Sequence, residues 1–512
     1  MMNDPIVSAA EGVIATTAAA WGLAARKWWP ALFLVTVLAA CSASLPPIDP
    51  QALPATPASY KEGDGRWTVA PPAEAQPRGE WWKAFGDPVL DDLVARATTA
   101  NASIQVAAAR LKQARAFVRA AEAQRMPEVD ASASSARGRG LVNGVPVQGT
   151  RSLFTAGAEL SYEVDLFGRL AQGVDAAKLD AQSAQGLLQS ARLLVQADVA
   201  QTYLALRAID DERSLVRSTV VAYQETLALT ERRYRAGDAA ELDVARARTE
   251  VAATESEALA LDRRRAELEH ALAVLIGEPA SNFTLAVGAW DTALPIIPAG
   301  VPSTLLTRRP DVAAAQNSLL AAQTRVGVAK AAWFPSIALT STAGYASTDL
   351  SDLFKWSSRA WGLGLLGTLP LFDGGRRKAG IENASGEFDA SIARYREQVL
   401  VAFQDVEDQL SALRLLAEQS QAQDRAVTSA ARSTALSDIR YRNGYVSQLE
   451  LLDAQRSELR NRREALQVRS AQYQSTVALV RALGGDWSVT SVTEPRGAEI
   501  KAQPHAAMLS VP

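Results

Sequence analysis

The stretches RYRAGDAAELDV (233–244) and RYRNGYVSQLEL (440–451) are two copies of one sequence pattern. Gly237 of the first copy returns 207 positions later as Gly444 of the second. In both copies the glycine interrupts a helical pattern, which is the usual signal for a turn between two helices. A repeat of this length is too long for a solenoid or a propeller blade. We therefore expect two large homologous halves, each with a helical hairpin.

Other segments repeat at nearly the same spacing. They include Tyr234, which returns as Tyr441, the segment 104–129, which returns as 312–337, and LFGR (166–169), which returns as LFDGGR (371–376). The duplication therefore covers most of the chain. We expect a first repeat over 80–285, a second repeat over 286–485 and a C-terminal tail over 486–512.

Long helices account for most of each repeat. From Val199 to Tyr234, alternating steps of three and four residues meet mostly apolar side chains, which is the pattern of a coiled-coil seam. The same steps starting at Leu449 give a second seam. The pattern predicts four long helices, over 170–234, 242–276, 376–441 and 448–483. The first and third of these would each be about 100 Å long.

A second pattern, in which apolar and polar residues alternate, lies between the helices of each repeat. It is strict over 154–166 and recurs over 361–369, where Trp361 and Leu363 alternate with glycines. Alternation with a period of two is typical of β-strands. We therefore expect two β-hairpins, over 128–166 and 336–370, with loops at 138–150 and 346–358.

Apolar residues on one strand face and carboxylates on the other suit a membrane β-barrel with lipid outside and water inside. The residues expected to line the barrel lumen are Glu159, Ser161, Glu163 and Asp165. The alternative is a half-buried sheet in a soluble protein. Four strands cannot close a membrane barrel, because an open edge would expose unpaired backbone groups to lipid. The barrel must be shared between chains; a cyclic trimer would supply twelve strands, although the spacing does not fix the number three.

The N-terminal residues do not belong to this duplicated fold. Arg26 and Lys27 precede a short apolar run that ends in Leu-Ala-Ala-Cys at Cys41, the single cysteine of the chain. The run fits the apolar part of a signal peptide, here 1–40, and is too short to span a bilayer stably. Small residues before a cysteine resemble the lipobox of bacterial lipoproteins, so we expect lipid on Cys41; an ordinary signal peptide with an incidental cysteine is the alternative. Residues 41–79 are interpreted as an extended tether.

Charge and motifs argue against other classes of function. The formal net charge is −3, which leaves no basic surface for nucleic acid. GLGLLG (362–367) matches a dinucleotide fingerprint, but it lies in a strand pattern and no helix follows it. His270 and His505 have no companions typical of metal or acid-base sites. We expect no enzyme activity and no cofactor, and we interpret the arginine run 263–265 as a solvated helix face.

A family resemblance rests on several motifs in order. They are the lipobox at Cys41, YEVDLFGR (162–169), RRPDV (308–312), LFDGGR (371–376) and the paired RYRxG turns. Together they make the chain similar to the NodT-type outer-membrane lipoproteins of resistance-nodulation-division efflux systems. The resemblance implies a mixed α and β fold, in which a twelve-stranded barrel formed by a homotrimer in the bacterial outer membrane continues into a long periplasmic α-helical barrel.

The same resemblance implies function and partners. The chain would be a passive exit channel for small molecules, working with a periplasmic adaptor and an inner-membrane pump. Outer-membrane lipid would surround the barrel and anchor the chain. An outlet of a type I secretion system is the alternative, and a catalytic or scaffolding coiled-coil protein is a third class, which would leave the amphipathic strands without a role.

The resemblance also implies two sets of functional residues near the helical turns. The adaptor would contact the turns, at Arg235, Gly237, Arg442 and Gly444. The glycines would also let other backbones approach closely. The periplasmic gate would comprise Leu449 and Asp453, on one helical face, and a polar lock formed by Arg440 and Tyr441 with Asp243. The position aligned with Asp453 in the first repeat is Arg246, so an acidic ring would come from the second repeat alone.

Overall fold

The computed structural model describes residues 45–62, 79–142, 145–295, 297 and 308–485. These residues form two compact units, each of which is assembled from distant parts of the chain. The sheet unit draws on 45–55, 106–189 and 310–401, and the hairpin unit on 56–105, 190–309 and 402–485. The predicted signal peptide, Cys41 and the tail 486–512 lie outside the described residues.

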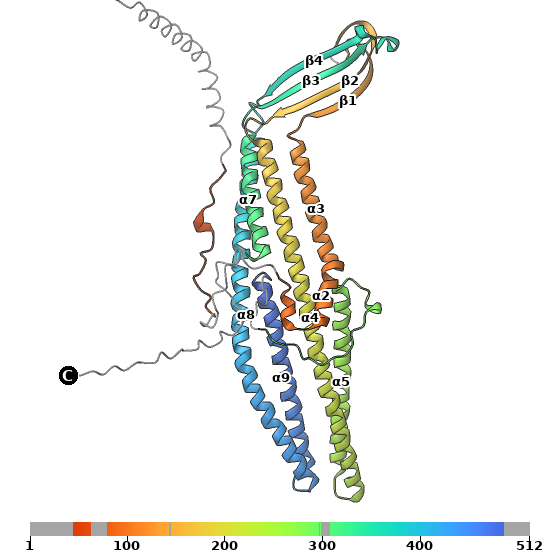
Figure 1. Cartoon of the computed structure of the whole chain (residues 1–512), viewed down its shortest axis with the longest axis vertical. Helices are drawn as coiled ribbons and strands as arrows, with labels where there is room; N and C mark the ends of the chain where they lie inside the picture. The colour runs from red at the N-terminus through yellow and green to blue at the C-terminus, as the bar shows by residue number, and fades with distance from the viewer. Residues whose placement is uncertain (1–44, 63–78, 143–144, 296, 298–307, 486–512) are drawn as a thin grey trace, which may run out of the picture. The chain divides into compact units, whose positions relative to one another are not determined.

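The sheet unit contains one antiparallel sheet with the strand order β1-β2-β3-β4 (Figure 1). The strands are β1 (Glu128–Val142), β2 (Val145–Val164), β3 (Ser336–Ser347) and β4 (Arg359–Thr368). Both predicted hairpins are therefore present. The predicted loop 138–150 was wrong for most of its length, because β1 and β2 remain paired through it with a register shift after Arg139. The second loop holds two short turns, η5 (Leu350–Asp352) and η6 (Trp356–Ser358).

The strand register separates polar from apolar side chains, because directly paired residues point to the same face. One face carries in one row Asp130, Glu159, Thr342 and Gly362. The adjacent row, on the opposite face, consists of Val129, Leu160, Ser341 and Leu363. Leu363 and Leu365 are 78% and 71% exposed, so the described chain leaves the apolar face largely uncovered along β4.

Helices α3 (Ala102–Ala123) and α7 (Pro310–Ala331) precede the two hairpins, and the helices α4 (Arg169–Ala236) and α8 (Arg376–Arg442) follow them. In the sheet unit, Leu319 and Val326 of α7 form a small core with Phe388 of α8. Gly186 of α4 lets α7 pack closely, since a Cβ there would lie 2.8 Å from the carbonyl oxygen of Pro310. The absence of a side chain at Gly186 thus permits the close spacing of α4 and α7.

The hairpin unit contains the C-terminal parts of α4 and α8 and their return helices α5 (Glu241–Leu275) and α9 (Gln448–Ala482). The elements α2 (Pro88–Ala100), η3 (Trp81–Phe85) and η4 (Ala280–Asn282) complete it. All four predicted long helices are confirmed to within two residues at each end. The seam of α4 is buried at Val199, Leu206, Val216, Tyr223 and Thr230. No described helix has enough apolar length to cross a membrane.

A buried ionic cluster ties α4 to α5 in the hairpin unit. Asp210, whose side chain is 1% exposed, accepts hydrogen bonds from Arg207, Arg213 and Arg265 at 2.7–3.3 Å. Arg265 and Arg207 also donate to the backbone carbonyls of Leu285 and Ala286. The interpretation of the run 263–265 as solvated was therefore wrong for Arg265. Asp210 is the shared partner of this cluster, so its removal would leave buried guanidinium charge less compensated and should destabilise the contact between α4 and α5.

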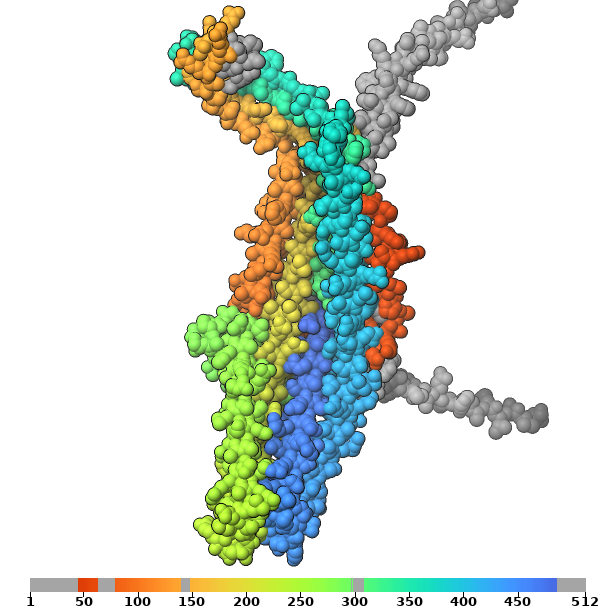
Figure 2. Space-filling view, turned by 180° about the vertical axis from the view of Figure 1, so that it is seen from behind, coloured from red at the N-terminus to blue at the C-terminus, as the bar shows by residue number. Residues whose placement is uncertain are grey.

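The described part of the predicted tether lies on helices rather than free (Figure 2). In the sheet unit, Gln323 of α7 donates to the carbonyl oxygen of Pro46 at 2.7 Å, next to the short turn η1 (Pro50–Ala52). In the hairpin unit, the Glu407 carboxylate of α8 accepts the backbone N–H groups of Lys61 and Glu62 at 2.7 and 3.0 Å. The tether is thus fastened to each unit by specific hydrogen bonds.

Candidate functional site at the hairpin tips and on the sheet

The two turns that end α4 and α8 have the same geometry. Gly237 and Gly444 adopt φ values of 84° and 77°, in the left-handed region that favours glycine. At each turn the glycine N–H bonds to a carbonyl three residues back, at 3.0 Å, and the next N–H bonds to a carbonyl five residues back, at 2.8 Å. This pair of bonds is the Schellman motif. The duplicated sequence pattern therefore encodes a duplicated turn.

The tips of these turns are open surfaces. A Cβ built on Gly237 or Gly444 would meet no atom within 4 Å, so the chain itself makes no close backbone approach there. The glycines are required by their positive φ values, and any use of the open space would come from a partner. Arg235 and Arg442 are exposed beside them, and Arg442 pairs with Asp438 at 2.9 Å.

The residues that follow the turns start the return helices. The Ser447 hydroxyl accepts the backbone N–H of Glu450 at 3.4 Å, as an N-cap of α9. At the start of α5 the capping position is Ala240, whose side chain cannot accept a hydrogen bond. Instead the Asp243 carboxylate accepts the Ala240 N–H at 3.4 Å, and its other contact is Arg246 at 3.8 Å. Asp243 therefore serves the start of its own helix.

Tyr441 joins the two hairpins of the chain. It is buried, its Oη lies 3.1 Å from the Thr230 Oγ1, and the Arg233 guanidinium lies 4.5 Å from its ring centroid. Arg233 also donates to the carbonyl oxygens of Tyr441 and Arg442, both at 3.0 Å. Hydrogen bonds and a cation–π contact thus hold α8 against α4 at the tip.

The predicted polar lock is not assembled within one chain. Arg440 pairs with Glu450 of its own hairpin at 3.7 Å, and Tyr441 contacts Thr230 and Arg233 instead of Asp243. The contact between hairpins that sequence reasoning missed is Arg233 with Tyr441. The RYR pattern flags both residues, but the pattern alone does not show that the first copy of the arginine meets the second copy of the tyrosine.

Leu449 and Asp453 lie exposed on α9, with the Asp453 side chain 64% exposed. Counting Leu449 as the first seam residue was wrong, because the buried seam begins at Leu451 and Leu452. Asp453 lies 3.6 Å from Arg456, which reduces the field of its carboxylate. The exposed pair on one helical face is the arrangement that the gate hypothesis requires, and its role stays a prediction.

Arg456 also makes a contact between hairpins that the sequence did not reveal. Its Nε donates to the Glu250 carboxylate of α5 at 2.9 Å. One turn nearer the tip on α9, Leu452 packs with Tyr223 and Val251 in a small apolar cluster. Ion pairing and apolar packing thus both join the hairpins of a single chain.

The strand residues predicted to line a lumen divide into two groups. Glu159 and Ser161 are exposed on the polar face, in register with Thr342 and Thr340. Glu163 also belongs to that face, and its carboxylate accepts hydrogen bonds from Arg169 at 2.7 and 2.8 Å.

The lumen assignment of Asp165 was wrong. Asp165 lies just beyond β2, and its carboxylate accepts the backbone N–H groups of Leu170 and Ala171 at 3.2 and 2.7 Å. It therefore caps α4, a role that alternation along a strand does not predict.

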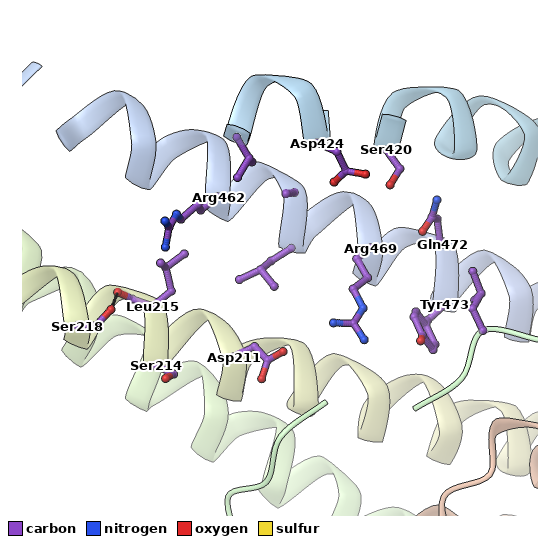
Figure 3. A pocket seen from close by; sticks show the side chains of 14 residues that line it. Asp211, Ser214, Leu215, Ser218, Ser420, Asp424, Arg462, Arg469, Gln472 and Tyr473 are labelled. Carbon is purple, nitrogen blue, oxygen red and sulfur yellow. Dashed lines mark hydrogen bonds between the residues drawn. The ribbon is translucent and has the colours of Figure 1, made fainter. Parts of the chain in front are cut away.

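A cavity of about 760 Å³ opens between α4, α8 and α9 in the hairpin unit (Figure 3). Arg469 points into the cavity from α9, stacks on the Trp290 ring at 4.4 Å and donates to the Trp290 carbonyl oxygen at 2.8 Å. Burial raises the pKa of the neighbouring Asp211, while the charge of Arg469 opposes that rise. Across the described residues, no group of three His, Cys, Asp or Glu side chains is placed to hold a metal ion.

The chain matches the outer membrane efflux protein family over residues 93–278 and 301–485. The solvent efflux pump outer membrane protein SrpC of Pseudomonas putida is 34% identical over 413 residues, covering 79% of this chain and 87% of SrpC. The pyoverdine export outer membrane protein OpmQ of the same species is 33% identical over 464 residues, covering 89% of this chain and 97% of OpmQ. The solved outer-membrane channel OprN superposes with a TM-score of 0.80 at 29% identity, covering 87% of this chain and 99% of OprN.

A four-stranded sheet with an apolar and a polar face, joined to long paired helices in a duplicated chain, defines the class of outer-membrane channel-tunnels. This chain belongs to the outer membrane efflux protein family. The predicted fold class, the internal duplication and the family resemblance are confirmed. The family consists of transport proteins of the outer membrane, which is the location that the relatives support for this chain.

Proposed function

We propose that this chain is the outer-membrane exit channel of a tripartite efflux system, which passively conducts small molecules to the exterior. The observation that carries the proposal is the sheet, which has an uncovered apolar face, a polar face and two open edges. Such a sheet is stable in a membrane only if lipid covers the apolar face and other strands pair with β1 and β4. Water would fill the space on the polar side.

The edges are best satisfied by two further copies of the chain. Three sheets of four strands would close a barrel of twelve, within the size range of known membrane barrels. Aromatic side chains support this placement. Trp356 and Trp361 are exposed at one end of the strands, and Phe167 stacks on Phe334 at the other, at 4.8 Å between ring centroids. Membrane barrels carry aromatic girdles at both interfaces.

The proposed partners follow from the turns of the hairpin unit. The exposed turns at Gly237 and Gly444 would receive a periplasmic adaptor, which connects the channel to an inner-membrane pump. In a trimer, Leu449 and Asp453 would each form a ring of three and restrict the periplasmic mouth. Asp453 rings would favour cations, as carboxylate rings do in channels.

The comparisons define the kind of transport protein more narrowly than the kind of molecule that it transports. SrpC is named for solvent efflux and OpmQ for pyoverdine export, although both are similarly related to this chain. A passive duct can serve such different molecules because the pump selects them. We therefore propose small molecules as substrates and leave the choice among them to the pump.

The test combines transport with conductance. Deletion of the gene should raise intracellular accumulation of small toxic compounds, and the wild-type chain should restore efflux. The purified protein should open ion-conducting channels in planar bilayers. Absence of both effects would reject the proposal, whereas loss of protein export with normal small-molecule efflux would favour a type I secretion outlet.

A further inference from the structure

Several contacts join the first repeat to the second within the chain, and two of them have counterparts that the duplication leaves exposed. In the sheet unit, Phe167 of the first repeat stacks on Phe334 of the second, with an interplanar angle of 14°. In the hairpin unit, Arg233 of the first repeat lies over the ring of Tyr441 of the second. Each contact uses one residue from each repeat, so the duplication supplies a counterpart for every member.

The counterparts of the aromatic pair are uncovered apolar side chains. LFGR and LFDGGR align Phe167 with Phe372, which is 92% exposed. Phe334 precedes Pro335 as Met126 precedes Pro127, and Met126 is 66% exposed. A methionine sulfur packs favourably against an aromatic ring, so the chemistry of the original contact is preserved.

The counterparts of the cation–π pair are identical residues. The spacing of 207 aligns Arg233 with Arg440 and Tyr441 with Tyr234. Tyr441 is 4% exposed under its arginine, whereas Tyr234 is 45% exposed. The Arg440 side chain is 58% exposed, and its contact with Glu450 lies within its own hairpin. A residue that is buried in one copy and exposed in the other indicates a missing neighbour.

We propose that these contacts recur between subunits: Arg440 lies over Tyr234 of the partner subunit, and Phe372 packs on Met126 of the partner subunit. The inference rests on the proposed trimer. In a closed ring the repeats follow one another in the order first, second, first, second. The second repeat of one chain therefore meets the first repeat of the next chain, just as the first repeat meets the second within one chain. Strand order agrees, because β4 is the open edge that would face the next β1.

One of the ion pairs between the hairpins, Glu250 with Arg456, does not recur. Glu250 and Arg456 pair within the chain, but a spacing of 207 aligns them with Ser457 and Thr249. The proposed subunit contact in the hairpin unit therefore contains the arginine–tyrosine contact without this ion pair. Arg440 and Tyr234 would consequently contribute a larger fraction of the interaction free energy between subunits than Arg233 and Tyr441 contribute between the hairpins of one chain.

Cysteine pairs in the full-length membrane protein test the proposal. The two pairs between subunits are Tyr234→Cys with Arg440→Cys and Met126→Cys with Phe372→Cys. Their matched controls within the chain are Arg233→Cys with Tyr441→Cys and Phe167→Cys with Phe334→Cys. After treatment with a short thiol cross-linker, the first two should give covalent dimers and trimers on a denaturing gel, and the controls should stay monomeric. Single-cysteine variants correct for Cys41 and for random collisions.

The proposal would be overturned if the control pairs within the chain form cross-links while the two pairs between subunits do not. Amine cross-linking of the wild-type chain is run in parallel. If it gives trimers while the subunit pairs stay monomeric, the proposed subunit contact is wrong and the trimeric channel stands; if it gives no oligomer, the proposed function itself fails.

A double-mutant cycle covers cysteine variants that do not assemble. Tyr234→Ala and Arg440→Ala should lower the dissociation temperature of the trimer non-additively, because the residues are in contact. Additive effects would also overturn the proposal.

Discussion

Within a single chain, equivalent residues of the two repeats have different surroundings. Tyr441 is buried at the contact between hairpins, while its copy Tyr234 is exposed. Asp453 and its aligned counterpart Arg246 carry opposite charges, and each lies beside an oppositely charged neighbour three residues away. At the scale of the residue, the two hairpins of a chain therefore differ in charge, and a gate at their tips should depend on the second hairpin.

The first prediction concerns the gate. Asp453→Ala should raise single-channel conductance and weaken cation preference, because it removes a ring of three carboxylates from the mouth. Asp453→Glu keeps the charge and should behave like the wild type. Arg440→Ala should loosen closure while the trimer still forms. Planar bilayer recordings measure all three variants; wild-type conductance and selectivity in both alanine variants would show that these residues do not restrict the mouth.

The second prediction concerns Asp211 in the cavity between the hairpins. Burial raises its pKa in the folded chain. Its favourable contribution to stability is therefore present at low pH, where the carboxyl is protonated, and is lost as pH rises through the folded pKa. Asp211→Asn should raise the thermal unfolding temperature at neutral pH, with the difference shrinking below about pH 4. The exposed Asp424→Asn, from the same cavity, is the control and should change little; an equal effect of both variants would contradict the burial argument.

The elements divide into those set by local pattern and those that need partners. Helices α4, α5, α8 and α9 follow from periodicity and from the two turn glycines. The strands also follow from their pattern, yet their side chains stay exposed in a single chain. At the scale of the element, the effect of a substitution on stability should therefore depend on which strand face it occupies or, in a turn, on whether the new residue tolerates a positive φ.

The third prediction uses neighbouring residues on β2. Leu160 lies on the apolar face and Ser161 on the polar face. Leu160→Lys should destabilise the assembled barrel by about 2–4 kcal/mol if it lies near the bilayer midplane, whereas Ser161→Lys should mainly change ion preference. Chemical unfolding in lipid vesicles and bilayer recordings are the measurements. Normal assembly of Leu160→Lys together with failure of Ser161→Lys would reverse the assignment of the faces.

The fourth prediction concerns the turn at Gly444. Its φ of 77° should make Gly444→Val cost about 1–2 kcal/mol, whereas asparagine tolerates this region better. If the adaptor needs the open space above the glycine, both Gly444→Val and Gly444→Asn should lose adaptor cross-linking in trimers that still form. Cross-linking that survives in the asparagine variant would assign the glycine to the turn alone.

At the scale of the whole molecule, one chain alone leaves backbone hydrogen-bonding groups unpaired and apolar side chains exposed. Its sheet has two open edges, and its apolar strand face is uncovered. The segment before the first repeat is fastened to helices of each unit by hydrogen bonds. The stability of one chain should therefore depend on pairing of its sheet edges with other chains and on lipid that covers its apolar face.

The fifth prediction is that Cys41 carries lipid and is the first residue of the mature protein. The short apolar run followed by Leu-Ala-Ala-Cys supports this. Mass spectrometry of the mature N-terminal peptide should show the acylated cysteine, and Cys41→Ser should abolish the mass increase. An unmodified cysteine, or a mature terminus elsewhere, would contradict the prediction.

The sequence predicted most of the fold because its signals were local. Periodicity located the helices, alternation located the strands, and Gly237 and Gly444 located the turns. Three features depended on contacts between distant residues and could not be read from spacing. Arg265 is buried by Asp210, Asp165 turns from the strand to cap α4, and Arg233 reaches Tyr441 across the hairpins.

If Cys41 carries lipid, the fastened N-terminal segment would limit how far the sheet unit can lie from the membrane. Leu45 lies against Gly327, since a Cβ built there would be 2.9 Å from the leucine side chain, and Pro46 is bonded to Gln323. Four residue steps separate Leu45 from Cys41. A chain of that length reaches about 14 Å at full extension. Acyl groups on Cys41 would therefore hold Leu45, and with it α7, within this distance of the bilayer surface. Insertion of residues between Cys41 and Leu45 should increase the allowed distance without altering the channel itself.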